Sequence, residues 1–139
     1  MEIELKYQEV YSAWQSDPES FWMEAAEGID WFVKPSKAFS TDEHCKYQWF
    51  SDASVNCCWN ALDRHVANGK GNHTAIIYDS PVTGIKRTLT FDELLEKTAK
   101  FAGALKRSGI QKGDRVIIYM PMIPEAIIAM LACARLGAI

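Results

Sequence analysis

The chain has 139 residues, the length of one ordinary domain, with 48% hydrophobic and 24% charged residues. Its net charge of −3 argues against a nucleic-acid binder, which normally carries a basic stripe. Lysines and arginines are spread along the chain, so charge alone indicates no partner.

Signals for secretion and membrane insertion are weak in this sequence. The start, MEIELKYQEVY, lacks the basic and apolar regions of a secretion signal and the arginine-rich character of a transit peptide. The most apolar segment, residues 116–130, contains Pro121, Pro124 and Glu125, so we expect no membrane span. The cysteines show no CxxC spacing, which favours reduced thiols and a cytoplasmic protein; they are Cys45, Cys57, Cys58 and Cys133.

The first fifty residues are rich in aromatic side chains and predict two short helices. Three aromatics within Tyr7–Trp14 recur at i, i+4 and i+7, the spacing of one helix face. Asp17 followed by Pro18 is typical of an N-cap and first position of a second helix. Residues 35–52 lose this periodicity and predict an extended loop. We expect a lid whose aromatics serve packing.

A third helix and a hairpin are expected next. Apolar residues recur at helical spacing over residues 55–68, and Gly69 follows as a C-terminal signal. Two β-rich runs at 74–78 and 87–91 flank a loop at 79–84 that contains proline and glycine, which predicts antiparallel pairing.

The clearest helix begins at Thr90, which together with Glu93 has the spacing of a capping box, and it ends near Gly109. Its expected buried stripe is Leu94, Leu95, Thr98, Phe101, Ala102 and Leu105.

The last part of the chain predicts the start of a parallel sheet. Residues 115–119 are apolar on both faces, as in a covered parallel strand, and a helix from Pro124 to Gly137 follows. The expected fold class is α/β: a helical and loop lid, a β-hairpin, and the first βα units of a doubly wound parallel sheet. Because the second strand of this βαβ unit is not present, we expect the front piece of a larger protein.

Three short motifs invite a functional interpretation, and a structural role is favoured for each. Asp63–His65 contains acid and base groups, but neighbours on a helix point in different directions, so we expect hydrogen bonds between lid and sheet. Gly69–Gly71 follows a helix rather than a strand, unlike a phosphate loop. Met120–Glu125 lies at a strand's carboxyl end but offers no glycine, and Glu125 would repel phosphate. No catalytic, cofactor-binding or metal-binding residue is assigned.

Three segments resemble a known family. Residues 119–139, YMPMIPEAIIAMLACARLGAI, closely resemble a segment of the AMP-forming acyl-CoA synthetases. Residues 56–71, NCCWNALDRHVANGKG, resemble a signature of the short-chain acetyl- and propionyl-CoA synthetases. YDSPVTG at 78–84 is more similar to the propionate enzymes. Ser51–Ser54 depart from the glycine turn often found there in the family.

This resemblance implies a lid region over residues 1–66 and the start of the ligase domain over 67–139. It implies that a short-chain carboxylate attacks the α-phosphate of Mg²⁺-ATP, and that coenzyme A then displaces AMP from the acyl-adenylate. The family's phosphate loop, adenine site, carboxylate pocket and catalytic lysine would lie beyond Ile139, so no family site residue is placed on this chain.

An alternative is an independent α/β module that binds nucleotide or protein without catalysis. The terminal helix argues against it, because Ile127, Ile128, Met130 and Leu131 lie on more than one side. Leaving two or three such side chains exposed forgoes about 4–8 kcal/mol of burial. We therefore expect a catalytically inactive piece that associates with itself, with small molecules, no nucleic acid and no membrane as partners of the whole protein.

Overall fold

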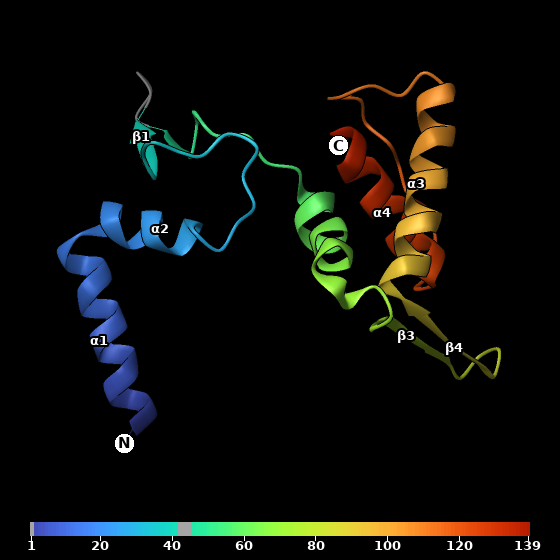
Figure 1. Ribbon diagram of the computed structural model, residues 1–139, viewed down its shortest axis with the longest axis horizontal. Coiled ribbons are helices and arrows are strands. Elements are labelled where there is room, and N and C mark those ends of the chain that lie inside the picture. Colours follow the sequence, from blue (N-terminus) through green and yellow to red (C-terminus); the bar gives the residue numbers. More distant parts are fainter. Residues whose placement is uncertain (1, 42–45) are drawn as a thin grey trace. The chain divides into compact units, whose positions relative to one another are not determined.

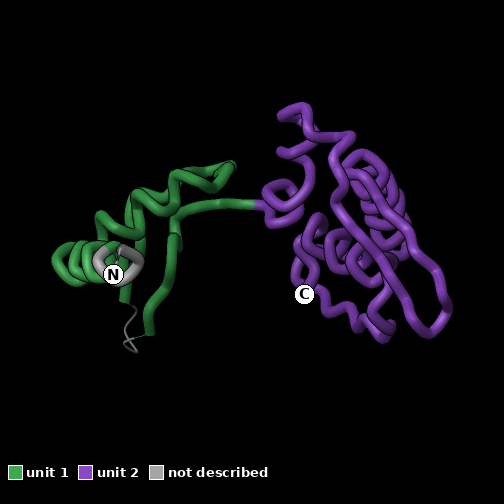
Figure 2. The backbone as a smooth tube through the Cα atoms, turned by 90° about the horizontal axis from the view of Figure 1, so that it is seen from below, with its two compact units in different colours: residues 1–55 green, residues 56–139 purple. Residues whose placement is uncertain are grey.

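The computed structural model describes residues 2–41 and 46–139, so the predicted free thiol of Cys45 lies outside it. The chain forms two compact units, residues 1–55 and residues 56–139, which we describe separately (Figure 2). Within the described ranges, no helix has both the length and the apolar character needed to cross a bilayer. The α/β class is confirmed.

The first unit begins with the two predicted helices, α1 (Glu2–Ser16) and α2 (Pro18–Ala26) (Figure 1). The Ser20 backbone N–H donates to Asp17 Oδ1 at 3.0 Å, which confirms the N-cap. On α1 the Tyr7 and Tyr11 rings stack with centroids 5.8 Å apart, as expected from one helix face.

A small antiparallel sheet replaces the extended loop that the sequence predicts for residues 35–52, so that prediction is wrong there. Strand β1 (Phe39–Thr41) pairs with β2 (Tyr47–Trp49). The Phe39 ring lies 5.5 Å from the Trp49 ring, centroid to centroid, and such cross-strand aromatic pairs stabilise a sheet. Three-residue strands are too short to show a period of two in the sequence.

The turn after β2 explains how this chain does without the family's glycine. Phe50 itself adopts the left-handed conformation, with φ of +47°. The Asp52 carboxylate accepts hydrogen bonds from the backbone N–H and the hydroxyl of Ser36, and these bonds hold the Asp52 pKa below its usual value. The turn is thus formed by Phe50 in a strained conformation and is held by the hydrogen bonds from Ser36 to Asp52.

The second unit starts with a helical segment over residues 57–70, close to the predicted 55–68. Two stretches of it are π-helical, η1 (Trp59–Asp63) and η2 (Val66–Lys70). The predicted hairpin follows as β3 (Thr74–Ser80) and β4 (Ile85–Thr90), paired antiparallel.

Helices α3 (Phe91–Arg107) and α4 (Pro124–Leu136) pack against each other and complete this unit (Figure 1). The Thr90–Glu93 capping box forms, with both reciprocal hydrogen bonds present. Most of the predicted α3 stripe is buried or half-buried, but Phe101 is exposed. The core cluster consists of Cys58, Leu62, Leu94 and Ile128.

Residues 115–119 are extended but form only the beginning of the predicted strand. The Ile139 N–H donates to Asp114 O at 2.7 Å, and the Val116 N–H donates to Ile139 O at 2.8 Å. This alternation is the hydrogen-bond pattern of a parallel pair. Beyond Val116, the backbone of residues 117–120 makes no hydrogen bond within the described chain, so no regular strand develops.

Replacing the cap residue should weaken the second unit. Thr90→Ala removes the acceptor for the Glu93 N–H, and we expect a loss of about 1 kcal/mol in the free energy of unfolding, measured by urea denaturation. Thr83→Ala, in the exposed hairpin loop, is the control and should change it by less than about 0.5 kcal/mol. Equal losses of unfolding free energy in the two variants would show that the Thr90 cap does not stabilise this unit.

Candidate functional site

A polar junction joins the start of the helical segment 57–70 to the end of α4, and Asn56 is its centre. The Asn56 Oδ1 atom accepts from the Trp59 N–H at 3.1 Å. Its Nδ2 atom donates to Arg135 O at 3.1 Å and to Ala134 O at 3.4 Å. One side chain therefore satisfies open backbone groups at two helix ends, which otherwise have no intrahelical partners.

Arg135 extends this junction through a partly buried ion pair. Its Nη2 atom lies 2.5 Å from Asp63 Oδ2, and the two side chains are 26% and 18% exposed. The same nitrogen lies 3.5 Å from the sulfur of Cys58, a residue that is fully buried. Burial raises the pKa of the Cys58 thiol despite the opposing effect of Arg135. This thiol is therefore protonated at neutral pH and poorly suited to act as a nucleophile.

Two members of the acid–base motif Asp63–His65 contact neighbouring helices. Asp63 binds Arg135 of α4, whereas the His65 ring contacts the Phe91 ring of α3 at 5.3 Å. The two side chains thus serve different neighbours, as expected for adjacent helical positions. The partners are helices rather than the sheet that the sequence suggests.

Gly69 and Gly71 are structural as well. Gly69 has φ of +77° at the end of the helical segment. A Cβ atom on Gly71 would lie 2.3 Å from Asp92 Oδ2, and the Asp92 N–H donates to Gly71 O at 3.0 Å. A carboxylate therefore occupies the space beside this loop, which disfavours a phosphate there.

The turn between residue 119 and α4 is the part of the chain nearest to the expected ligand edge of the sheet. Pro124 is buried at the first position of α4, after Ile123 in extended conformation. Glu125 lies 3.4 Å from Arg87 of β4, whose guanidinium stacks over the Tyr78 ring at 5.3 Å. The first turn of α4 thus contacts the hairpin through an exposed ion pair. That residues 120–125 serve a structural role stays a prediction.

No group of three histidine, cysteine or acidic residues in the described ranges could hold a metal ion. The described cysteines Cys57, Cys58 and Cys133 are free thiols. The prediction that this chain carries no site residue stays a prediction. Sequence reasoning missed the roles of Asn56 and Arg135, because their pairing joins residues about eighty positions apart and leaves no local pattern.

Breaking the buried ion pair should cost more than breaking an exposed one. We expect Asp63→Asn to lower the free energy of unfolding by about 2 kcal/mol, less than for a fully buried pair because both side chains retain some exposure. The matched control is Asp79→Asn, whose pair with Lys86 is mostly exposed and should be worth less than about 1 kcal/mol.

A double-mutant cycle with Arg135→Gln isolates the coupling between the two side chains. Urea denaturation measures all four proteins. Additive effects of Asp63→Asn and Arg135→Gln would show that the pair contributes no coupling energy.

Two family models match consecutive parts of the chain. The acetyl-coenzyme A synthetase N-terminus matches residues 7–61, and the AMP-binding enzyme matches residues 62–139. The change from one to the other falls within the helical segment 57–70.

The chain is also similar to full-length relatives. It is 51% identical over 134 residues to acyl-CoA synthetase short-chain family member 3, mitochondrial, from Bos taurus and from Homo sapiens, covering 96% of this chain and 20% of each relative. It is 44% identical over 138 residues to acetyl-coenzyme A synthetase of Desulfatibacillum aliphaticivorans, covering 96% of this chain and 21% of that protein. The chain thus spans about a fifth of the length of these relatives. It belongs to the AMP-binding enzyme family.

Proposed function

We propose that this chain is the N-terminal part of an ATP-dependent, AMP-forming ligase that joins a short-chain carboxylate to coenzyme A. The observation that carries the proposal is the order of the two family models, an acetyl-coenzyme A synthetase N-terminus followed directly by an AMP-binding enzyme. The similarity to short-chain acyl-CoA and acetyl-CoA synthetases supports the same substrate class.

We propose that the whole protein uses Mg²⁺-ATP and coenzyme A and forms an acyl-adenylate as intermediate. The described residues would supply structural support for the ligase domain. The Asn56–Asp63–Arg135 junction fixes α4, and Arg87 ties the turn before α4 to the hairpin. The reacting groups would come from sequence beyond this chain.

Propionate is the proposed acid, with acetate as the alternative. The support is the resemblance of the hairpin segment 78–84 to propionyl-CoA synthetases. In the structure this segment forms the end of β3 and an exposed loop. The resemblance therefore indicates shared ancestry with the propionate enzymes rather than contact of this segment with the acid.

An assay of the full-length protein tests both parts of this proposal. We expect AMP release that depends on coenzyme A, with kcat/KM about tenfold or more higher for propionate than for acetate, the discrimination that one methylene group allows. The 139-residue chain alone should release no AMP. A preference for acetate would refute propionate, and AMP release by the chain alone would favour an independent module.

We further propose that the isolated 139-residue chain associates with itself through its extended segment 116–120. Ile117 and Tyr119 are 92% and 100% exposed, and the backbone of 117–120 is without hydrogen bonds in the described chain. An uncharged, β-prone segment with free backbone groups is a template for pairing with a second copy.

Size-exclusion chromatography with light scattering should find a dimer or larger species. Tyr119→Lys should shift it to monomer, because a charged residue on an edge strand opposes pairing. Val82→Lys is the control, since Val82 is also 93% exposed but lies in the hairpin loop, and it should leave the assembly unchanged. A monomeric wild-type chain would refute the proposal that the chain associates with itself through residues 116–120.

A further inference from the structure

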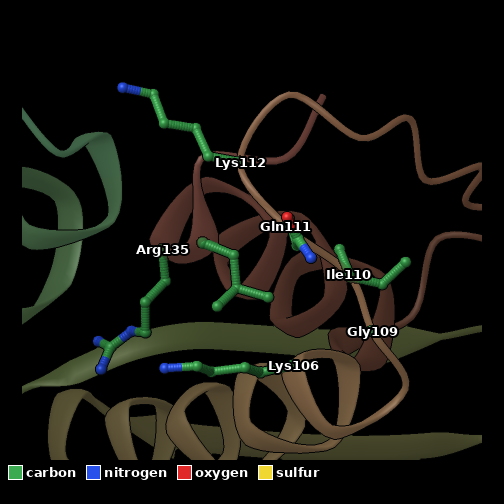
Figure 3. A pocket seen from close by; sticks show the side chains of 7 residues that line it. Lys106, Gly109, Ile110, Gln111, Lys112 and Arg135 are labelled. Carbon is green, nitrogen blue, oxygen red and sulfur yellow. The ribbon is translucent and has the colours of Figure 1, made fainter.

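We propose that a basic hollow in the second unit binds an oxyanion of the phosphate type. The hollow has a volume of about 490 Å³ and lies where the ends of α3 and α4 meet the turn before residue 115 (Figure 3). Its lining residues are Lys106, Gly109, Ile110, Gln111, Lys112, Arg135 and Leu136.

The first argument is charge. Three of the lining residues are cationic and none is acidic, although the whole chain has a net charge of −3. Lys106 and Lys112 form no ion pair within the described residues, whereas Asp63 offsets the charge of Arg135. The side chains of Lys106 and Arg135 point to the same side of the hollow, whereas Lys112 extends from the opposite rim and away from them (Figure 3). The excess positive charge is therefore local, and it is offset only in part, because the Asp114 carboxylate accepts from the N–H of the lining residue Gln111 at 2.7 Å.

The second argument is an incomplete set of hydrogen bonds. The Nε atom of Arg135 is buried and has no acceptor within the described residues. A guanidinium group has five N–H donors, and its bonds to Asp63 and Cys58 use only Nη2. Buried donors normally have a partner in protein, water or a bound ion. Because Nε is buried, an anion in the hollow would accept from Nη1, which makes no hydrogen bond within the described residues.

The helix macrodipole explains only part of this arrangement. Lys106 and Arg135 lie in the last turns of α3 and α4, where cations are favoured. The terminal carbonyl groups there already have partners, since the Ser108 N–H donates to Ala104 O and the Gly137 N–H donates to Ala134 O. The ammonium group of Lys106 is therefore not needed for capping and remains available to a ligand.

The hollow lies at one end of the extended segment 115–119. Lys112 precedes the extended segment 115–119, so the hollow lies at the amino end of that segment. Open α/β sheets bind their substrates at the carboxyl ends of the strands. The volume suits a small molecule, and two lysines with one arginine suit a phosphate group. That group could be free phosphate or pyrophosphate, or part of a nucleotide.

Nuclear magnetic resonance titration of the ¹⁵N-labelled 139-residue chain with phosphate, pyrophosphate and AMP tests this site. Choline chloride keeps the ionic strength constant, because surface attraction is screened by salt. We expect saturable shifts of the Gly109, Gln111 and Lys112 amides, and tighter binding of pyrophosphate than of phosphate. Equal affinities for AMP and phosphate would assign recognition to the phosphate group alone, whereas tighter binding of AMP would identify a nucleotide site.

Substitutions decide whether the hollow is the binding place. Lys106→Gln and Lys112→Gln should each weaken pyrophosphate binding about tenfold. Lys97→Gln is the matched control, because it removes the same charge from an exposed position of α3 that does not line the hollow. Shifts that never saturate, or equal affinities in all four proteins, would overturn the proposal. Ligase activity of the full-length protein does not enter this test.

Discussion

The docking of the helical segment 57–70 onto α3 and α4 is the constraint on which the second unit depends. Its free energy comes mainly from apolar burial, since Leu62 and Cys58 are fully buried and a buried leucine contributes about 1.5–3 kcal/mol. The polar contacts of Asn56 and Arg135 add less, but they are directional. They fix how far the segment slides along α4, which apolar contacts alone would not do.

This docking has consequences for the sheet. With α4 packed against α3 and held by the helical segment, its end returns beside the start of residues 115–119, where Ile139 makes hydrogen bonds in the parallel pattern (Figure 1). A helix between two parallel neighbours is the connection that such pairing requires. The signature at residues 56–71 therefore serves the sheet indirectly, by holding the crossover helix.

Local signals account for what could be predicted. The Thr90–Glu93 box, the Asp17 cap and the hairpin loop act over three to six residues, so the sequence displays them directly. The pairing of β1 with β2 and the contact between Asp63 and Arg135 depend on residues that meet only after folding. Phe101 illustrates the same limit. Helical spacing predicts which side of α3 Phe101 lies on, but not whether another residue packs over it, and in the structure it is exposed.

The two ends of the 115–119 segment differ in electrostatics in a way that the sequence conceals. From sequence alone, Glu125 at the carboxyl end is expected to repel phosphate. The structure pairs it with Arg87 at 3.4 Å, and although an exposed pair of this kind contributes little stability, it cancels the local negative charge. At the amino end, by contrast, the charges of Lys106 and Lys112 are offset only in part by Asp114, whose carboxylate accepts from the Gln111 N–H at 2.7 Å. The carboxyl end is therefore nearly neutral and the amino end keeps an excess of positive charge, so an anion attracted by long-range charge would meet the amino end first.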